Sequence, residues 1–203
     1  MEATKCDFTA GVAGRTLRGQ SISGDLYVIA PFLKGVLVAT IDGLGHGREA
    51  ALASQAAVET VLASAGQDVT SILKRCHESL RGTRGVVMSI ASLDSVDNSM
   101  TWLSVGNVEG YLVRAGLGVQ DKPCILMRGG VVGHSLPALR AERLSLRPGD
   151  TLVMATDGIR SGFAGVLDPL ISPQQIADKV IAGFARETDD ALVVVVRWFG
   201  SPG

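Results

Sequence analysis

Two largely apolar runs typical of buried strands, far apart in the chain, end in the same acid. Residues 36–41 lead to Asp42, residues 152–156 lead to Asp157, and a glycine follows each aspartate. A strand that is apolar on both faces lies inside the protein, so each run places its carboxylate at the edge of a core. The glycine allows a ligand or another backbone segment to approach closely. Because 115 residues separate the two acids, a site that uses both must be assembled by the fold.

Two further acidic signatures accompany strand-type runs. Asp25 begins one such run, and the pair Asp189 and Asp190 directly precedes the run 191–196. Taken singly, each signature has an ordinary interpretation, a tight turn for an Asp-Gly pair and a solvated N-cap pair for the adjacent acids. Carboxylates gathered without basic partners repel one another, and a hard divalent cation is the natural reason to collect them. The sequence therefore predicts an acidic metal site built from distant strand ends.

Three helices are expected, and two of them have clear start signals. Arg48–Ala65 is alanine-rich, which favours a long helix. Asp68 suits the N-cap of a second helix that ends near Gly82, and Ser172 starts a third through a capping box with Gln175. The residues that predict a buried face on the first helix are Leu52, Ala56, Val58, Val61 and Leu62.

Strands fill most of the remaining chain. The expected strands are Asp25–Ile29, Gly35–Ile41, Val86–Leu93, Met100–Val105, Gly110–Arg114, Cys124–Met127, Glu142–Leu146, Thr151–Thr156 and Ala191–Phe199. The helices thus occur in blocks and do not alternate regularly with strands, which indicates an α+β sandwich rather than a doubly wound sheet. No repeat, low-complexity tract or linker interrupts the sequence, so residues 1–203 are expected to form a single domain.

Composition argues against several classes of function. The formal net charge is −1 and the arginines are scattered, so nucleic acid is not an expected partner. No apolar stretch approaches the roughly 20 residues of a membrane helix, and the first residues lack a signal peptide, which predicts a cytoplasmic protein without a membrane partner. The three cysteines form no CxxC pair, and none has an arginine six positions later. A zinc site, a disulfide scaffold and a cysteine-dependent phosphatase are therefore not expected.

Four motifs, taken in order, resemble those of the PPM (PP2C-like) serine/threonine phosphatases, above all the bacterial branch that contains SpoIIE and the Rsb phosphatases. They are Ser23–Tyr27, Asp42–Gly47, Leu146–Leu152 running into Thr156–Gly158, and Asp189-Asp190 before a valine-rich strand. The resemblance spans about residues 20 to 198. It implies a PP2C-like αββα sandwich, in which helices flank two antiparallel sheets. It also implies a centre of two Mn²⁺ or Mg²⁺ ions.

The same resemblance implies roles for the acidic residues. Asp42 would bridge the two ions, and the Gly43 carbonyl would bind one of them. Carboxylate, carbonyl and water oxygens are hard ligands suited to Mg²⁺ and Mn²⁺. The other implied ligands are Asp25 at the ion that Gly43 binds, directly or through water, and Asp157 with Asp189 or alternatively Asp190 at the second ion.

The implied activity is hydrolysis of phosphoserine or phosphothreonine by a hydroxide held between the two ions. His46 is a candidate proton donor to the leaving alkoxide, although its place between two glycines favours a structural role in ordering the loop. Within this branch the expected substrates are phosphorylated stress-signalling proteins, the STAS-domain stressosome components of RsbR/RsbS type. The alternatives are a weak or inactive PPM-fold regulator that docks a signalling partner, and a two-metal hydrolase of small phosphoesters. The sequence carries no signal for an oligomeric state.

Overall fold

The computed structural model describes residues 7–116 and 127–200 and places two antiparallel sheets face to face. The four-stranded sheet contains, in spatial order, β1 (Asp7–Arg15), β9 (Ala191–Gly200), β8 (Thr151–Ala155) and β6 (Glu109–Val113). The five-stranded sheet contains, in spatial order, β2 (Asp25–Phe32), β3 (Gly35–Gly43), β4 (Val86–Asp94), β5 (Ser99–Val105) and β7 (Glu142–Ser145).

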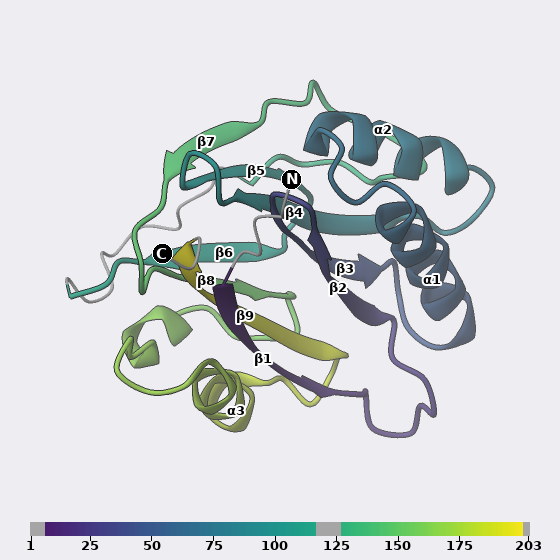
Figure 1. Cartoon of the computed structure of the whole chain (residues 1–203). Helices are drawn as coiled ribbons and strands as arrows, with labels where there is room; N and C mark the ends of the chain where they lie inside the picture. The colour runs from purple at the N-terminus through teal and green to yellow at the C-terminus, as the bar shows by residue number, and fades with distance from the viewer. Residues whose placement is uncertain (1–6, 117–126, 201–203) are drawn as a thin grey trace.

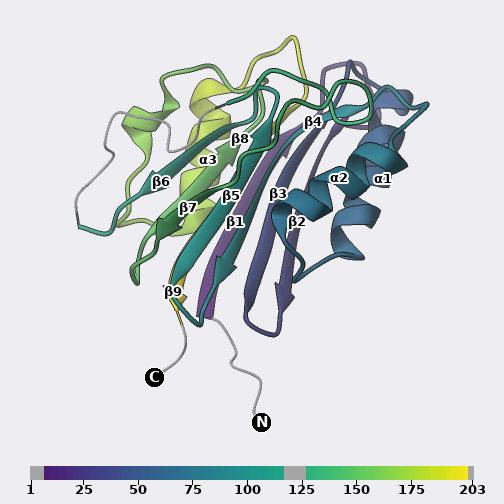
Figure 2. The same ribbon diagram turned by 90° about the horizontal axis from the view of Figure 1, so that it is seen from above.

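Helices cover the outer face of each sheet (Figure 1, Figure 2). The five-stranded sheet packs against α1 (Arg48–Leu62) and α2 (Val69–Ser79). The four-stranded sheet packs against α3 (Pro173–Phe184) and the short 3₁₀ helix η1 (Phe163–Val166). This order of layers, helices, sheet, sheet, helices, confirms the predicted α+β sandwich.

The alternation of side chains along β3 explains why its sequence is apolar throughout. Val36 and Val38 face the apolar layer between the two sheets, whereas Leu37 and Ala39 face α1 and α2. A strand buried on both faces needs apolar residues at every position. Continuing the alternation places Asp42 on the face that looks between the sheets, at the end where the strand stops.

Helix α1 approaches the sheet through small residues. Its buried residues are Ala50, Ala53, Ser54, Ala57 and Val61. Leu52 is 57% exposed and Leu62 is 51% exposed, so the prediction that both lie on the buried face is wrong. Only small side chains fit in the contact, because a Cβ added to Gly43 would lie 2.3 Å from the carbonyl oxygen of Ala50.

The predicted starts of the other two helices are confirmed. The Asp68 carboxylate accepts the N–H of Ser71 at 2.8 Å, which caps α2. Ser172 and Gln175 form both hydrogen bonds of the capping box at the start of α3. By contrast, α1 begins after Gly47 without a side-chain cap.

Strand β1 has no counterpart among the elements expected from the sequence, and neither does η1. Gly11 in the middle of β1 lies against α3, where an added Cβ would come within 2.2 Å of the Gln174 backbone nitrogen. The Gln174 side chain bonds both the N–H and the carbonyl of Val12. Glycine in a strand marks such a close approach, and it also weakens the strand signal in the sequence.

Some expectations fall outside the described residues. These are Cys6, Cys124 and all of the expected strand Cys124–Met127 except Met127. Cys76 lies on α2 and is buried against the five-stranded sheet. Burial raises the pKa of its thiol to about 12, so it is an unreactive core residue. Within the two described ranges, no helix combines the length and the apolar character needed to span a membrane.

Candidate active site

Asp25 and Asp42 lie directly opposite each other on neighbouring strands. They are partners in the β2–β3 ladder, so both side chains leave the same face of the sheet. Asp25 is buried at 7% exposure, and Asp42 is partly buried. Like charges in directly opposed positions destabilise a sheet. The strand register therefore brings two of the candidate ligands together at a cost that a bound cation would offset.

Asp42, Asp157 and Asp189 line one cleft of about 220 Å³. Asp42 lies at the end of β3, Asp157 follows β8, and Asp189 precedes β9, so the cleft forms where these three strands end or begin. Asp25 is not among the lining residues and is buried near Asp42. The other residues that line the cleft are Leu44, Gly45, His46, Val87, Asn107 and Thr188.

Thr156 holds Asp25 across the gap between the sheets. Its hydroxyl donates a hydrogen bond of 2.7 Å to the Asp25 carboxylate and accepts the N–H of Leu192 at 2.9 Å. The hydroxyl thus uses its single proton on the carboxylate, which fixes the orientation of that side chain. The threonine beside Asp157 therefore connects β2 to β8 and β9.

Asn107 was not identified as a site residue from the sequence, where it appears only as part of a turn with Gly106. In the structure its side-chain amide donates a 2.7 Å hydrogen bond to the Asp157 carboxylate, and both residues line the cleft. The Arg186 guanidinium bonds the Asp157 backbone carbonyl at 3.1 Å. A polar residue in the turn before a strand was the only available signal, and such turns are too common to single it out.

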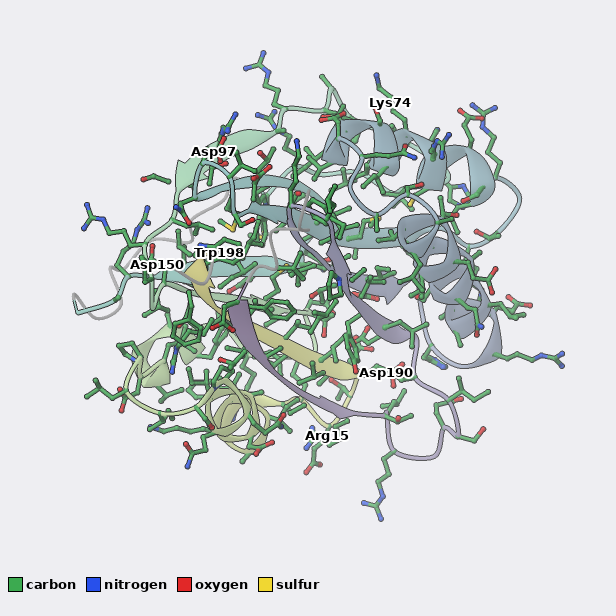
Figure 3. The ribbon with its side chains drawn as sticks, in the orientation of Figure 1. Arg15, Lys74, Asp97, Asp150, Asp190 and Trp198 are labelled. Carbon is green, nitrogen blue, oxygen red and sulfur yellow. The ribbon has the colours of Figure 1, made fainter. Side chains whose placement is uncertain are left out.

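Asp189 and Asp190 differ sharply in their surroundings. Asp189 is partly exposed and lines the cleft. Asp190 is 3% exposed, and its two carboxylate oxygens accept the N–H groups of Leu17 and Gly24, each at 2.7 Å. Figure 3 shows Asp190 at the start of β9. One carboxylate therefore closes the base of the loop between β1 and β2, while its neighbour faces the acids of the cleft.

Gly43 lies where three segments meet. Its N–H donates to the Gly24 carbonyl at 3.1 Å, and that same oxygen accepts the Ser54 hydroxyl of α1 at 2.5 Å. A Cβ on Gly43 would lie 2.3 Å from the Ala50 oxygen and 2.7 Å from the Ser54 oxygen. A larger residue would push α1 away from the strand end that carries Asp42.

The electrostatics of the site resist full ionisation. Burial, followed by the charges of the other acids, raises the pKa of Asp42 to about 8. Burial also raises the pKa of Asp25 to about 7, although the Thr156 hydrogen bond opposes the rise. The pKa of Asp189 is raised by burial and then by Asp157. None of these carboxylates forms a salt bridge within the described residues, and the attraction of His46 opposes the rise at Asp189 only in part.

The donor set fits a hard divalent ion. The cleft offers carboxylate oxygens, whose ionised form a dication would stabilise. As the side chains stand, the described residues contain no group of three or more acidic, histidine or cysteine side chains placed to hold one metal ion together. An open arrangement suits Mg²⁺, which keeps several waters and binds through one or two carboxylates.

His46 lies at the exposed edge of the cleft. Gln20 Nε2 is 3.4 Å from His46 Nδ1, an arrangement in which the amide donates to the ring nitrogen. Gly45 and Gly47, on either side of His46, have positive φ angles of 85° and 77°, which glycine adopts without strain. The two glycines thus present the ring at the cleft in a turn that other residues would strain.

The chain matches known proteins over most of its length. The family model described as stage II sporulation protein E (SpoIIE) matches residues 34–199. Phosphoserine phosphatase RsbX of Bacillus subtilis (strain 168) is 29% identical over 141 residues, which cover 70% of this chain and 69% of that protein.

Solved structures share the fold. One, from work on the bacterial stressosome as a modular system adapted to control secondary messenger signalling, has a TM-score of 0.85 and 27% identity. The match covers 94% of this chain and 100% of the other. RsbX in complex with magnesium has a TM-score of 0.84 and 24% identity, covering 94% of this chain and 95% of the other. These matches confirm the PP2C-like sandwich.

The resemblance drawn from the motifs is likewise confirmed. The family model extends from the start of β3 almost to the end of β9, and so contains the strand ends that supply Asp42, Asp157 and Asp189. The same matches support the predicted enzyme class, a protein phosphatase. The chain belongs to the SpoIIE family.

Proposed function

We propose that this chain is a metal-dependent phosphatase that hydrolyses phosphoserine or phosphothreonine in proteins. The observation that supports this proposal is the cleft lined by Asp42, Asp157 and Asp189, with Asp25 buried beside Asp42. None of these four acids forms a salt bridge within the described residues. Acids left unpaired in this way need a cation, and the related phosphoserine phosphatase RsbX supports the reaction class.

Two Mg²⁺ or Mn²⁺ ions would occupy this site. Asp42 would bridge them, in keeping with its central position and its strongly raised pKa. Magnesium bound to RsbX supports an ion of this kind. When bound, the ions would neutralise the phosphoryl oxygens and lower the pKa of a water molecule. The further ligands would be Gly43 through its carbonyl and Asp25 at one ion, and Asp157 and Asp189 at the other.

Other residues of the chain would hold these ligands in place. Thr156 would orient Asp25, and Asn107 would orient Asp157, through the hydrogen bonds that each donates. Asp190 would not be a ligand, because both of its oxygens are already engaged by backbone N–H groups. Groups that orient metal ligands commonly change metal affinity 10- to 100-fold when removed.

His46 would supply the proton for the leaving serine or threonine oxygen. Gln20 donates to Nδ1, so the neutral ring carries its proton on Nε2, which would hydrogen-bond the leaving oxygen as negative charge develops on it. The exposed position of His46 at the edge of the cleft gives it access to the leaving group of a bound protein.

The substrates would be phosphorylated STAS-domain components of a bacterial stressosome, acted on in the cytoplasm. The proposal draws support from the stressosome-related structure and from RsbX. A single PPM-type domain over residues 1–203 would suffice for this activity.

The test combines phosphate release with metal binding. The chain is incubated with a phosphorylated STAS-domain protein, with Mn²⁺ or with EDTA, and metal binding is followed separately by calorimetric titration. We expect metal binding and metal-dependent loss of phosphoserine or phosphothreonine. Binding without hydrolysis would favour the docking regulator, and faster hydrolysis of small metabolites would favour a small-phosphoester hydrolase. Absence of binding at millimolar Mn²⁺ would contradict the proposal.

A further inference from the structure

A second depression borders the cleft on the side of α1. It measures about 380 Å³, and we call it the rim groove; its lining residues are Glu49, Leu52, Ala53, Gly82, Thr83 and Arg84. Leu52 is 57% exposed although it is a large apolar side chain, and Glu49 lies in the first turn of α1. The groove therefore offers an apolar contact and a charged pair side by side.

Arg84 connects the rim groove to the cleft. Its Nε lies 2.6 Å from the Glu49 carboxylate. The Nη1 atom of Arg84 lies close to Gly45: a Cβ added to that glycine would be 2.9 Å from it. Gly45 lines the cleft. The guanidinium thus lines the rim groove and has one of its nitrogens next to Gly45, a residue of the cleft.

The segment that carries Arg84 is held firmly in place. The N–H of Leu44, another residue of the cleft, donates to the Gly85 carbonyl at 3.1 Å. His134 Nε2 lies 2.9 Å from the Thr83 carbonyl, and the Thr83 hydroxyl donates to the Leu80 carbonyl at 2.7 Å. The backbone that carries Arg84 is therefore anchored, whereas the ion pair with Glu49, whose side chains are 47% and 67% exposed, orients the guanidinium only weakly.

A neighbouring ion pair provides a contrast. Arg81 lies 3.0 Å from Glu78, and both side chains are about two-thirds exposed. Glu78 lies on α2, and Arg81 is not among the residues that line the cleft or the rim groove. The two arginines are three residues apart and carry the same charge, yet of the two only Arg84 lines the rim groove and lies close to Gly45 of the cleft.

We propose that the rim groove holds the polypeptide segment next to the phosphorylated residue of the substrate protein, and that Arg84 binds an acidic side chain of that segment. This inference rests on the proposed protein phosphatase activity. In the active protein the cleft would be filled by the metal ions and the phosphoryl group, so the residue next to the phosphorylated one would lie outside it, at the rim. There the Arg84 guanidinium, which lines the rim groove, offers the complementary charge to an acidic side chain. Leu52 offers contact to an apolar neighbour on the same segment.

The test is a double-mutant cycle, in which one residue is changed in the enzyme and one in the peptide substrate. Two phosphoserine peptides are compared, identical except that one carries glutamate and the other glutamine beside the phosphoserine. The wild-type chain with Mn²⁺ should have a kcat/KM about tenfold higher for the glutamate peptide, the size of one charge-assisted hydrogen bond. Arg84→Ala should remove this preference, and Arg84→Glu should reverse it in favour of the glutamine peptide.

Arg81→Ala is the matched control, since it removes the same charge from the same surface and should keep the preference. A preference that survives Arg84→Ala, that disappears equally in Arg81→Ala, or that is absent from the wild type would overturn the inference. Hydrolysis of para-nitrophenyl phosphate by the wild type checks the phosphatase activity separately, so failure of the proposed function is seen before the peptides are compared. Thermal unfolding of each variant shows that the fold is retained.

Discussion

The two ends of the sandwich each bury an aspartate at the start of a strand, and the surroundings of the two carboxylates differ. Asp150, just before β8, is 1% exposed and accepts hydrogen bonds from the Arg114 guanidinium at 2.7 Å and from the N–H groups of Ala115 and Arg147, both at 3.0 Å. Asp25, at the start of β2, faces other acids and has a threonine hydroxyl as its side-chain donor. Figure 3 shows Asp150 and Asp190 at opposite ends of β9, the latter on the cleft side.

This difference separates a structural acid from a candidate ligand. A buried carboxylate supplied with a cation and backbone donors is stabilised within the protein. A buried carboxylate that has one hydroxyl donor and otherwise faces carboxylates is costly until a cation binds. Both acids follow a glycine and precede a strand, so the sequence pattern alone assigns them to the same class. The donors supplied by the rest of the fold make the distinction.

The largest effect is expected at the cleft. Asp42→Asn should lower metal-dependent kcat about 1,000-fold or more, because the residue between the two ions would lose its charge. Phosphate release from a phosphoserine peptide gives the measurement. Asp150→Asn is the matched control at the other end, and its kcat per folded molecule should stay near that of the wild type. Near-normal hydrolysis by Asp42→Asn would remove Asp42 from the metal centre.

At the opposite end, the expected loss is in stability. Asp150→Asn should lower the free energy of unfolding by about 3 kcal/mol, since it leaves Arg114 without its anion and weakens the bonds to two backbone N–H groups. Urea unfolding followed by circular dichroism measures the change. A loss smaller than about 1 kcal/mol would show that the bonding at this end contributes little.

Asp189 and Asp190 allow the same comparison, between a candidate ligand and a structural acid, within one dipeptide. Asp190→Asn should cost about 2 kcal/mol in stability, because an amide cannot accept as strongly from both Leu17 and Gly24. Asp189→Asn should leave stability nearly unchanged and weaken Mn²⁺ binding at least tenfold. Calorimetric titration and urea unfolding of both variants decide the matter. Interchanged results would make Asp190 the ligand.

Asn107 extends the comparison to a residue that touches a candidate ligand. Asn107→Ala should reduce Mn²⁺ affinity by about tenfold through loss of the hydrogen bond to Asp157. Asn107→Asp would add a negative charge beside Asp157 and should destabilise the metal-free protein. If the affinity of Asn107→Ala equals that of the wild type, the bond plays no part in metal binding.

The smallest effect is expected at a buried hydroxyl. Thr40 is fully buried, and its hydroxyl has no hydrogen-bond partner among the described residues. Thr40→Val should therefore change the free energy of unfolding by less than about 1 kcal/mol, in either direction, whereas Thr156→Val should cost about 2 kcal/mol. Equal losses in the two variants would mean that Thr40 has a partner, such as an ordered water.

The sequence predicted those parts of the fold and site that depend on local signals. The capping box at Ser172 and the apolar run before Asp42 follow from neighbouring residues, and the structure has both. The split between Asp189 and Asp190 depends on N–H groups more than 160 residues away, which local patterns do not encode. The exposure of Leu52 has the same origin, because the close contact of α1 with Gly43 selects the alanine face.

Thermal unfolding with and without Mn²⁺ shows whether the carboxylates that the fold gathers without salt-bridge partners bind divalent ions. Mn²⁺ at about 100 times its Kd should stabilise the wild type by about 2.7 kcal/mol. Asp42→Asn should be more stable than the wild type without metal, since an amide avoids the cost of burying an acid beside other acids, a cost that raises the pKa of Asp42 to about 8, and it should gain little from Mn²⁺. A wild-type melting temperature that millimolar Mn²⁺ leaves unchanged would contradict the account.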